Sequence, residues 1–330
     1  TILNSVLYQT QYSKDLGCMR LATIDIGTNT ALLLISEWGD DGLQEVFNAS
    51  GFARLGEGMD SSGRVGEAAL NRLEGVLHSH MEHIRIHKAS HIIVTGTSAS
   101  RDAKDADKIH SLVWKSTKSD LTILSGDEEA LVTFLGAAAG LGSLVDGPEL
   151  TVIDVGGGST EFVQGAARAD GEKISFKCSL NMGSVRMTER YFSQQPAPHS
   201  EIQTAKIQFR ELMSSHLENA KKTKICVGAS GTARILALVH HGINELSSTN
   251  GPASITRSQL EGWVHRLTQM TFEEVTALHP IKMSGRADVL PAGALILGEL
   301  LRFTDAETLI ISPFGVRHGV AIRYFRESCA

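Results

Sequence analysis

One stretch of the sequence, residues 151–162, indicates the fold. It reads Thr-Val-Ile-Asp-Val-Gly-Gly-Gly-Ser-Thr-Glu-Phe. An apolar, β-branched run leads to Asp154, and three consecutive glycines, two hydroxyl residues and a glutamate follow. Glycine adopts positive φ angles and leaves no side chain between the backbone amides and a bound anion, so this pattern is typical of a phosphate cradle. An acid beside such a cradle indicates a divalent metal ion. For a glycine run alone, an ordinary tight hairpin is the alternative.

A related stretch occurs earlier in the chain, at residues 21–34. Leu-Ala-Thr-Ile-Asp-Ile-Gly-Thr-Asn-Thr-Ala-Leu-Leu-Leu has the same order of apolar strand, aspartate, glycine, small polar residues and second apolar strand. We expect Asp25-Ile26-Gly27 and the following Thr28-Asn29-Thr30 to correspond to Asp154-Val155-Gly156 and Ser159-Thr160-Glu161. A repeat of domain size predicts two related halves that face one ligand.

The composition is that of a globular protein. The chain of 330 residues is long enough for two domains with cores of their own, and 42% of it is hydrophobic and 21% charged. The formal net charge of −6 argues against a generic nucleic-acid binder, which needs a basic surface for phosphate contacts. The four cysteines lie without Cys-x-x-Cys spacing. This spacing favours neither a zinc site nor a disulfide framework and fits a reduced, cytoplasmic setting.

The first 18 residues are polar and mixed, and they lack the apolar core of a signal peptide. Because Met19 and Arg20 directly precede the first apolar strand, we expect the folded part to begin near residue 19 and residues 1–18 to form a flexible tail. No stretch approaches the ~20 apolar residues of a membrane span, so no membrane partner is expected.

Three further loops join a predicted strand to a predicted helix, at the sheet edge where open α/β folds bind ligands. The first, Thr95-Gly96-Thr97, leads to Arg101, which is either a planar phosphate donor or a partner in a surface salt bridge. In the second, Ser125-Gly126-Asp127-Glu128-Glu129-Ala130, Ser125 and Glu128 have capping-box spacing, which leaves Glu129 without a structural explanation. The third is Gly228-Ala229-Ser230-Gly231-Thr232, and bare amides at a helix N-terminus bind anions readily.

The rest of the chain alternates strands and helices. The apolar periodicity predicts helices at residues 66–88 and 200–222, helical structure throughout residues 256–279, and a last helix from residue 315 to about residue 326. The helix at residues 66–88 contains four histidines, of which only His83 and His87 share a face. No acid completes a zinc signature there, so a solvated helix face is favoured over a metal site.

Taken in order, the motifs resemble those of the exopolyphosphatase/guanosine pentaphosphate phosphatase family, which belongs to the sugar kinase, Hsp70 and actin superfamily. The resemblance covers residues 20–325. Its Glu-Glu-Ala block distinguishes these phosphatases from kinases and actin-like ATPases. The matching motifs are Asp25-Ile26-Gly27-Thr28-Asn29-Thr30, Thr95-Gly96-Thr97 with Arg101, Ser125-Gly126-Asp127-Glu128-Glu129-Ala130, Asp154-Val155-Gly156-Gly157-Gly158-Ser159-Thr160-Glu161, Gly228-Ala229-Ser230-Gly231-Thr232 and Val316-Arg317-His318-Gly319-Val320.

The resemblance implies an α/β fold of two ribonuclease H-like domains. Each domain would be a mixed sheet flanked by helices, with the active site in the cleft between the domains. Residues 19–131 and the C-terminal helix within residues 316–330 would form the first domain, and residues 132–315 the second. The end of the sequence at residue 330 implies the short form of the family, without the C-terminal HD-type domain of longer members.

The resemblance also implies a reaction. Family members use a divalent cation, usually Mg²⁺, and release orthophosphate from the end of inorganic polyphosphate or the 5′-phosphate from guanosine pentaphosphate (pppGpp). Asp154 and Asp25 would hold the metal, Glu129 would orient or deprotonate the attacking water, Glu161 would assist, and Arg101 would stabilise charge. The phosphate-binding groups would be Gly27, Thr28, Asn29, Thr30, Gly156, Gly157, Gly158, Ser159, Thr160, Gly228, Ser230, Gly231 and Thr232.

The sequence leaves the substrate open. Exopolyphosphatase activity is the leading interpretation and pppGpp phosphatase activity the second. An ATP-binding kinase or actin-like switch protein is a third, against which the Glu-Glu-Ala block argues. Five arginines lie in or beside the motif loops: Arg54, Arg186, Arg234, Arg286 and Arg317. If most of them converge on the cleft, long polyphosphate is the favoured substrate. If only one or two do, a nucleotide or a short chain is favoured. On general grounds a homodimer is the commonest assembly.

Overall fold

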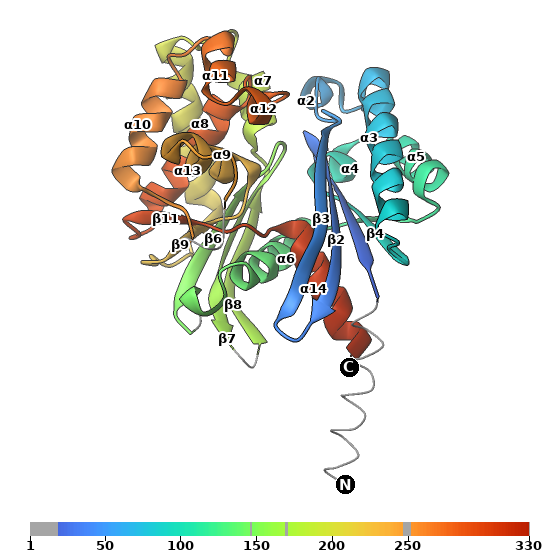
Figure 1. The fold of residues 1–330 in the computed structure, drawn as a ribbon. Helices are drawn as coiled ribbons and strands as arrows, with labels where there is room; N and C mark the ends of the chain where they lie inside the picture. The colour runs from blue at the N-terminus through green and yellow to red at the C-terminus, as the bar shows by residue number, and fades with distance from the viewer. Residues whose placement is uncertain (1–18, 146, 169–170, 247–251, 330) are drawn as a thin grey trace.

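The computed structural model describes residues 19–145, 147–168, 171–246 and 252–329. The tail expected at residues 1–18 lies outside these ranges. Two mixed sheets, each flanked by helices, lie side by side (Figure 1), which confirms the predicted fold class. Within the described ranges, no helix is long and apolar enough to cross a membrane.

The first sheet is built from the N-terminal third of the chain. Its order is β3-β2-β1-β4-β5, with β1 antiparallel to β2 and parallel to β4. Helices pack on it through an apolar cluster that includes Ile24, Leu33, Leu73 and Ile109. The strands are β1 (Leu21–Ile26), β2 (Thr30–Gly39), β3 (Gly42–Phe52), β4 (His91–Gly96) and β5 (Leu121–Ile123), and the helices are α2 (Met59–Ser62), α3 (Glu67–Ile86), α4 (Ser98–Asp102) and α5 (Ala106–Thr117).

The second sheet repeats this arrangement. Its order is β10-β11-β9-β6-β7-β8, with β6 antiparallel to β7 and parallel to β9. Without the edge strand β10, the order and strand directions match those of the first sheet. The two halves predicted from the repeated motif are therefore confirmed. The strands are β6 (Glu149–Val155), β7 (Thr160–Arg168), β8 (Gly171–Leu180), β9 (Cys226–Gly228), β10 (Ser254–Thr256) and β11 (Thr308–Ile311).

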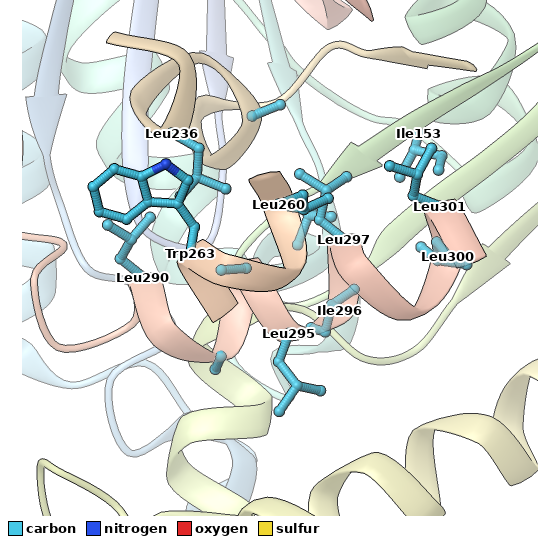
Figure 2. Close-up of a cluster of buried hydrophobic side chains, with 14 of the residues drawn as sticks. Ile153, Leu236, Leu260, Trp263, Leu290, Leu295, Ile296, Leu297, Leu300 and Leu301 are labelled. Atoms are coloured by element: carbon cyan, nitrogen blue, oxygen red, sulfur yellow. The ribbon is translucent and has the colours of Figure 1, made fainter. Parts of the chain in front are cut away.

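Helix α13 (Leu290–Phe303) forms the centre of the core of the second half. Every residue from 290 to 301 is buried, so this helix is apolar around nearly its whole circumference. Figure 2 shows Leu290 beside Trp263 of α10 and Leu236 of α9, Leu297 beside Leu260 of α10, and Leu301 beside Ile153 of β6. Pro291 lies in the first turn, where a missing amide is tolerated. The other helices here are α7 (Ser184–Tyr191), α8 (His199–His216), α9 (Gly231–His241), α10 (Arg257–Leu267), α11 (Phe272–Leu278) and α12 (Pro280–Met283), with a 3₁₀ turn at Gly142–Val145.

Two helices are exchanged between the halves. Helix α6 (Gly126–Ala139) follows β5 of the first sheet but packs on the second, with Phe134 in one apolar cluster with Val152. Helix α14 (Val316–Cys329) follows β11 of the second sheet but packs on the first, where Phe325 lies with Leu21 (Figure 1). The domain boundary expected between residues 131 and 132 falls inside α6 and stays a prediction.

The exchanged helices cross in direct contact through glycine. A Cβ on Gly136 would lie 2.2 Å from the carbonyl oxygen of Gly315, and one on Gly319 would lie 1.8 Å from that of Val132. Both positions therefore require glycine, because no side chain fits between the two backbones.

Three local predictions were wrong. Residues 256–279 form two helices, because Thr271 and Glu274 make a capping box that starts α11. The helix expected to reach residue 222 ends at His216, where the chain turns to bury Leu217. His80 of α3 is not on a solvated face: it is 2% exposed, and its Nε2 lies 3.2 Å from the carbonyl oxygen of Ala31.

Candidate active site

A cleft of about 570 Å³ lies between the two halves of the molecule. Its lining brings together the two motif hairpins, the start of α6 and the loop before α9. The predicted site residues that line it are Asp25, Gly27, Thr28, Asn29, Thr30, Glu129, Asp154, Gly156, Gly157, Gly158, Ser159, Glu161, Ser230, Gly231 and Thr232.

The two motif hairpins have the same backbone geometry. In each, the amide of the glycine after the aspartate donates to a carbonyl three residues later: Gly27 to Thr30 at 2.9 Å, and Gly156 to Ser159 at 3.0 Å. Thr30 therefore corresponds to Ser159, and the expected correspondence of Thr30 with Glu161 was wrong. The strand registers give the reason, since Asp154 pairs with Glu161 whereas Asp25 pairs with Leu32.

The hairpins approach each other closely across the cleft. A Cβ on Gly157 would lie 2.9 Å from the Cβ of Thr28, and one on Gly158 would lie 2.5 Å from the Oγ of Ser98. These glycines therefore permit closure of the cleft as well as leaving backbone amides bare. Any side chain at either position would push the two halves apart.

Four carboxyl groups gather where the hairpins meet. Burial raises the pKa of Asp154 to about 6, and burial together with the Asp154 charge raises the pKa of Asp25 to about 7 and of Glu161 to about 8. Burial and the Glu161 charge raise the pKa of Glu129 well above its usual range. Four such acids cannot all ionise without compensation, so the cluster is suited to hold protons or a cation.

Glu129 is placed by the first turn of α6. Ser125 and Glu128 form the predicted capping box: the Ser125 amide donates to Glu128 Oε2 at 2.8 Å, and the Glu128 amide donates to Ser125 Oγ at 3.2 Å. The next residue, Glu129, consequently points to the cleft and is 6% exposed. Arg101 Nη1 donates to Glu129 Oε2 at 3.1 Å and to the Leu124 carbonyl at 2.7 Å.

Three predicted site residues are not among the residues that line the cleft. Arg101 reaches it only through Glu129. The Thr160 hydroxyl donates to the Met182 carbonyl at 2.6 Å, which leaves it no free proton for a phosphate. Gly228 lets α9 pack close to β9, since a Cβ there would lie 2.7 Å from that of Ala233.

Other polar groups at the site were not predicted. Ser98 lines the cleft beside the glycine loop, and Lys282 lines it from the region of α12. Ser179 Oγ donates to Glu161 Oε1 at 2.9 Å, because the β7–β8 register sets the two residues opposite each other. Ser98 could have been predicted, because it belongs to the run of small residues that follows β4. The register that places Ser179 has no such signal in the sequence.

Three of the five motif-loop arginines line the cleft: Arg234, Arg286 and Arg317. Burial and the charge of Arg234 lower the pKa of both Arg286 and Arg317 to about 10, so each of these two guanidinium groups lies close enough to Arg234 to be repelled by it. The Nε atoms of Arg286 and Arg317 are buried without a hydrogen-bond partner. The cleft therefore sets a group of cations beside its group of acids, an arrangement that suits an anion carried together with a metal ion.

The remaining two arginines are engaged elsewhere. Arg54 Nη2 donates to Asp288 Oδ2 at 2.5 Å, and Arg186 Nη2 donates to Asp102 Oδ2 at 2.7 Å. Both pairs join the two halves of the molecule, so these arginines are not free to bind a substrate.

The donor set fits a hard cation such as Mg²⁺. Asp25 Oδ1 is buried without a hydrogen-bond partner beside Asp154. The four acids influence one another's pKa values, but across the described ranges no three histidine, cysteine or acidic side chains are placed so that they could hold a metal ion by themselves. Mg²⁺ does not need such a site, because it usually binds through one or two carboxylates and completes its shell with water and substrate phosphate.

Two sheets of the same strand order, two matching glycine hairpins and buried acids between them define a two-domain protein of actin-like fold with a phosphate-binding cleft. The chain belongs to the Ppx/GppA phosphatase family, whose model matches residues 34–327. It is therefore a phosphatase, and the kinase or switch-protein interpretation is set aside.

Relatives agree with this assignment. The chain is 31% identical over 327 residues to Exopolyphosphatase 2 of Mycobacterium tuberculosis, which covers 92% of this chain and 98% of the relative. The structure of the Aquifex aeolicus Ppx/GppA family member is 27% identical, with a TM-score of 0.75 over 94% of this chain and 98% of that one. An exopolyphosphatase from Cytophaga hutchinsonii, 23% identical, shares the fold with a TM-score of 0.83 over 94% of this chain and 98% of that one.

Proposed function

We propose that this protein is an exopolyphosphatase that removes the terminal phosphate of inorganic polyphosphate with the help of Mg²⁺. The observation that carries the proposal is the group of three arginines in the same cleft as the acids and glycine loops. A polyphosphate chain carries negative charge along its whole length, so it needs cationic partners beyond the site of cleavage. The name of the M. tuberculosis relative supports the same substrate.

The residues divide the work of hydrolysis between them. A phosphoanhydride resists hydrolysis because its negative charge repels the nucleophile, so catalysis rests on charge neutralisation and on positioning the attacking water. The backbone amides of Gly157 and Gly158, with Ser159 and Thr28, hold the terminal phosphoryl group. Arg234, Arg286 and Arg317 hold the phosphates behind it.

Glu129 orients the attacking water and accepts its proton in this proposal. Its raised pKa favours this role, since a carboxylate with a higher pKa is a stronger base once it is ionised. Arg101 holds the Glu129 carboxylate in place. Asp154 and Asp25 would hold Mg²⁺, which would supply charge neutralisation to the phosphate oxygens, and Glu161 would assist beside them.

Hydrolysis of pppGpp is the second candidate. The specific observation in its favour is apolar surface in the same cleft, contributed by Phe52, Ile235 and Leu238. The guanidinium of Arg286 lies 5.2 Å from the centre of the Phe52 ring. A nucleobase has a flat apolar face that such a wall accommodates, whereas a polyphosphate chain has none.

A phosphate-release assay separates the candidates. The substrates are polyphosphates of defined lengths, pppGpp and ATP, each with and without Mg²⁺. We expect the largest kcat/KM for polyphosphate and release only with Mg²⁺. Preference for pppGpp establishes the second candidate, and release from none of the substrates contradicts the proposal.

A further inference from the structure

Arg186 is a buried arginine that the proposed mechanism does not use. Its side chain is 9% exposed. It extends from the first turn of α7 towards the other half of the molecule. Nη2 donates to Asp102 Oδ2 at 2.7 Å, Nε lies 3.5 Å from Asp60 Oδ1, and Nη1 donates to Asn181 Oδ1. Asp102 ends α4 and Asp60 lies in α2, so the guanidinium joins two elements of the first half to α7.

The backbone of α7 is tied to the glycine loop at residues 156–158. The amides of Val185 and Arg186 donate to the Gly157 carbonyl at 2.9 and 3.2 Å, and the amide of Ser184 donates to the Gly156 carbonyl at 2.9 Å. A Cβ on Gly183 would lie 2.4 Å from the carbonyl carbon of Gly157. The helix and the loop are therefore in contact along the backbone and move together.

The acid that receives Arg186 is also tied to the cleft. Ser98 Oγ donates to Asp102 Oδ2 at 3.2 Å, which is the oxygen that Arg186 contacts. Ser98 is in turn the residue against which Gly158 packs. The Arg186–Asp102 pair is thus connected, through Ser98, to the point where the glycine loop meets the first half of the molecule.

The same face of α7 makes two further contacts with the first half. Arg190 donates to both oxygens of Asp60, at 2.6 and 2.7 Å, and Glu189 Oε1 accepts from the Gly58 amide at 2.9 Å. Residues 186, 189 and 190 are neighbours on one side of a helix. Arg190 is 37% exposed, so Arg186 is the more deeply buried of the two arginines.

We propose that Arg186 is a positioning residue: through Asp102 and Asp60 it holds the cleft closed and so sets the glycine loop against Ser98 and Thr28. It does not touch the substrate. This inference rests on the proposed function for its kinetic consequence, whereas its structural consequence is independent of any substrate.

The kinetic consequence is a loss of turnover more than of affinity. Closure brings the glycine loop, Glu129 and the metal-binding acids into one geometry, and small displacements of reacting groups cost on the order of 100-fold in rate. We therefore expect Arg186→Met to lower kcat on polyphosphate by on the order of 100-fold. We expect KM to change much less. Arg186→Lys keeps the charge near Asp102 and restores part of the rate.

The structural test is small-angle X-ray scattering of the full chain without substrate, alongside kinetics. We expect a larger radius of gyration for Arg186→Met and for Asp102→Asn than for the wild type, with Arg186→Lys between them. Arg210→Met is the matched control, because Arg210 pairs with Glu299 at 2.7 Å inside the second half. It should leave both readouts unchanged.

Each outcome decides the proposal. Unchanged dimensions in both Arg186→Met and Asp102→Asn overturn it, and a rise in KM alone with unchanged dimensions assigns Arg186 to substrate binding instead. If Arg186→Met does not fold, Asp102→Asn tests the same contact from the other side. A wild type that releases no phosphate contradicts the proposed function but leaves the scattering test valid.

Discussion

Glu128 and Glu129 are neighbours in the sequence, but their carboxylates act in different places. Glu128 caps α6 through Ser125, and Glu129 is buried in the cleft beside Arg101. We expect Glu129→Gln to lower kcat for phosphate release by ~10²–10⁴-fold, the range for loss of a general base, because an amide cannot accept the proton of water.

Glu128→Gln is the matched control. Glutamine also completes a capping box, so we expect near-normal turnover from this variant. Circular dichroism and the melting temperature verify that both variants fold. An active Glu129→Gln enzyme removes Glu129 from the mechanism.

Arg317 allows a test of the arginine group. Its Nε is buried without a partner and it lines the cleft, so Arg317→Met removes a charged donor from the cleft. We expect KM for polyphosphate to rise by about 10–100-fold, as for a lost hydrogen bond to a charged group. Arg326→Met is the control on the same helix, since Arg326 pairs with Glu172 at 2.9 Å outside the cleft. Equal KM values for the two variants contradict the role of Arg317.

Residue-level prediction from the sequence succeeded where a motif supplied a local reason. Glu129 was singled out because capping explained Glu128, and capping depends on neighbours within one turn. The contact of Ser179 with Glu161 depends on the register of two strands, which side-chain alternation alone does not fix. The pairing of Arg186 with Asp102 joins residues 84 positions apart in the chain.

At the scale of elements, the crossing of α6 and α14 depends on glycine. We expect Gly319→Ala to lower the free energy of unfolding by about 1–3 kcal/mol, the usual effect of overpacking, because its methyl group would overlap the Val132 carbonyl. Phosphate release should fall with it, since α6 carries Glu129.

Gly262→Ala in α10 is the control. No atom lies within 4 Å of a Cβ at Gly262, and alanine favours a helix over glycine by ~1 kcal/mol. Chemical denaturation should therefore show a more stable protein for Gly262→Ala and a less stable one for Gly319→Ala. Equal stability of the two variants contradicts the close crossing.

The elements themselves were largely predictable, because apolar periodicity, caps and glycine loops are local. The two hairpins and most helices lie where the sequence pattern predicted them. Local periodicity does not predict the exchange of α6 and α14, since an apolar helix face does not say which sheet it covers. The return of the C-terminal helix to the first half was expected from the family resemblance alone. The break between α10 and α11 was missed although Thr271 and Glu274 have capping-box spacing.

At the scale of the whole molecule, the buried acids link stability to pH and to metal. In the folded protein the pKa values of Asp154, Asp25 and Glu161 are raised to about 6, 7 and 8 from their ordinary values of 3.8, 3.8 and 4.5. Between pH ~4 and ~8 these three acids therefore bind more protons in the folded protein than in the unfolded chain, and their contribution to stability falls as pH rises. A divalent cation replaces those protons and reverses the loss.

We therefore expect Mg²⁺ to raise the melting temperature more at pH 8 than at pH 5. Differential scanning fluorimetry at both pH values, with Mg²⁺ or with a chelator, measures the effect without any substrate. Asp154→Asn should reduce the stabilisation at pH 8. A shift that is equal at both pH values, or unchanged in Asp154→Asn, contradicts a metal site at these acids.

The helix exchange also bears on the order in which the protein is made. Domains tend to fold from the N-terminus onward while the chain is being synthesised. Here the first sheet is covered by α14, which is translated long after β1 and β2. Leu21 and Leu34 consequently lack their packing partners until Ala321 and Phe325 have been synthesised. A nascent chain is thus exposed to chaperones and proteases through one open sheet face until α14 has left the ribosome.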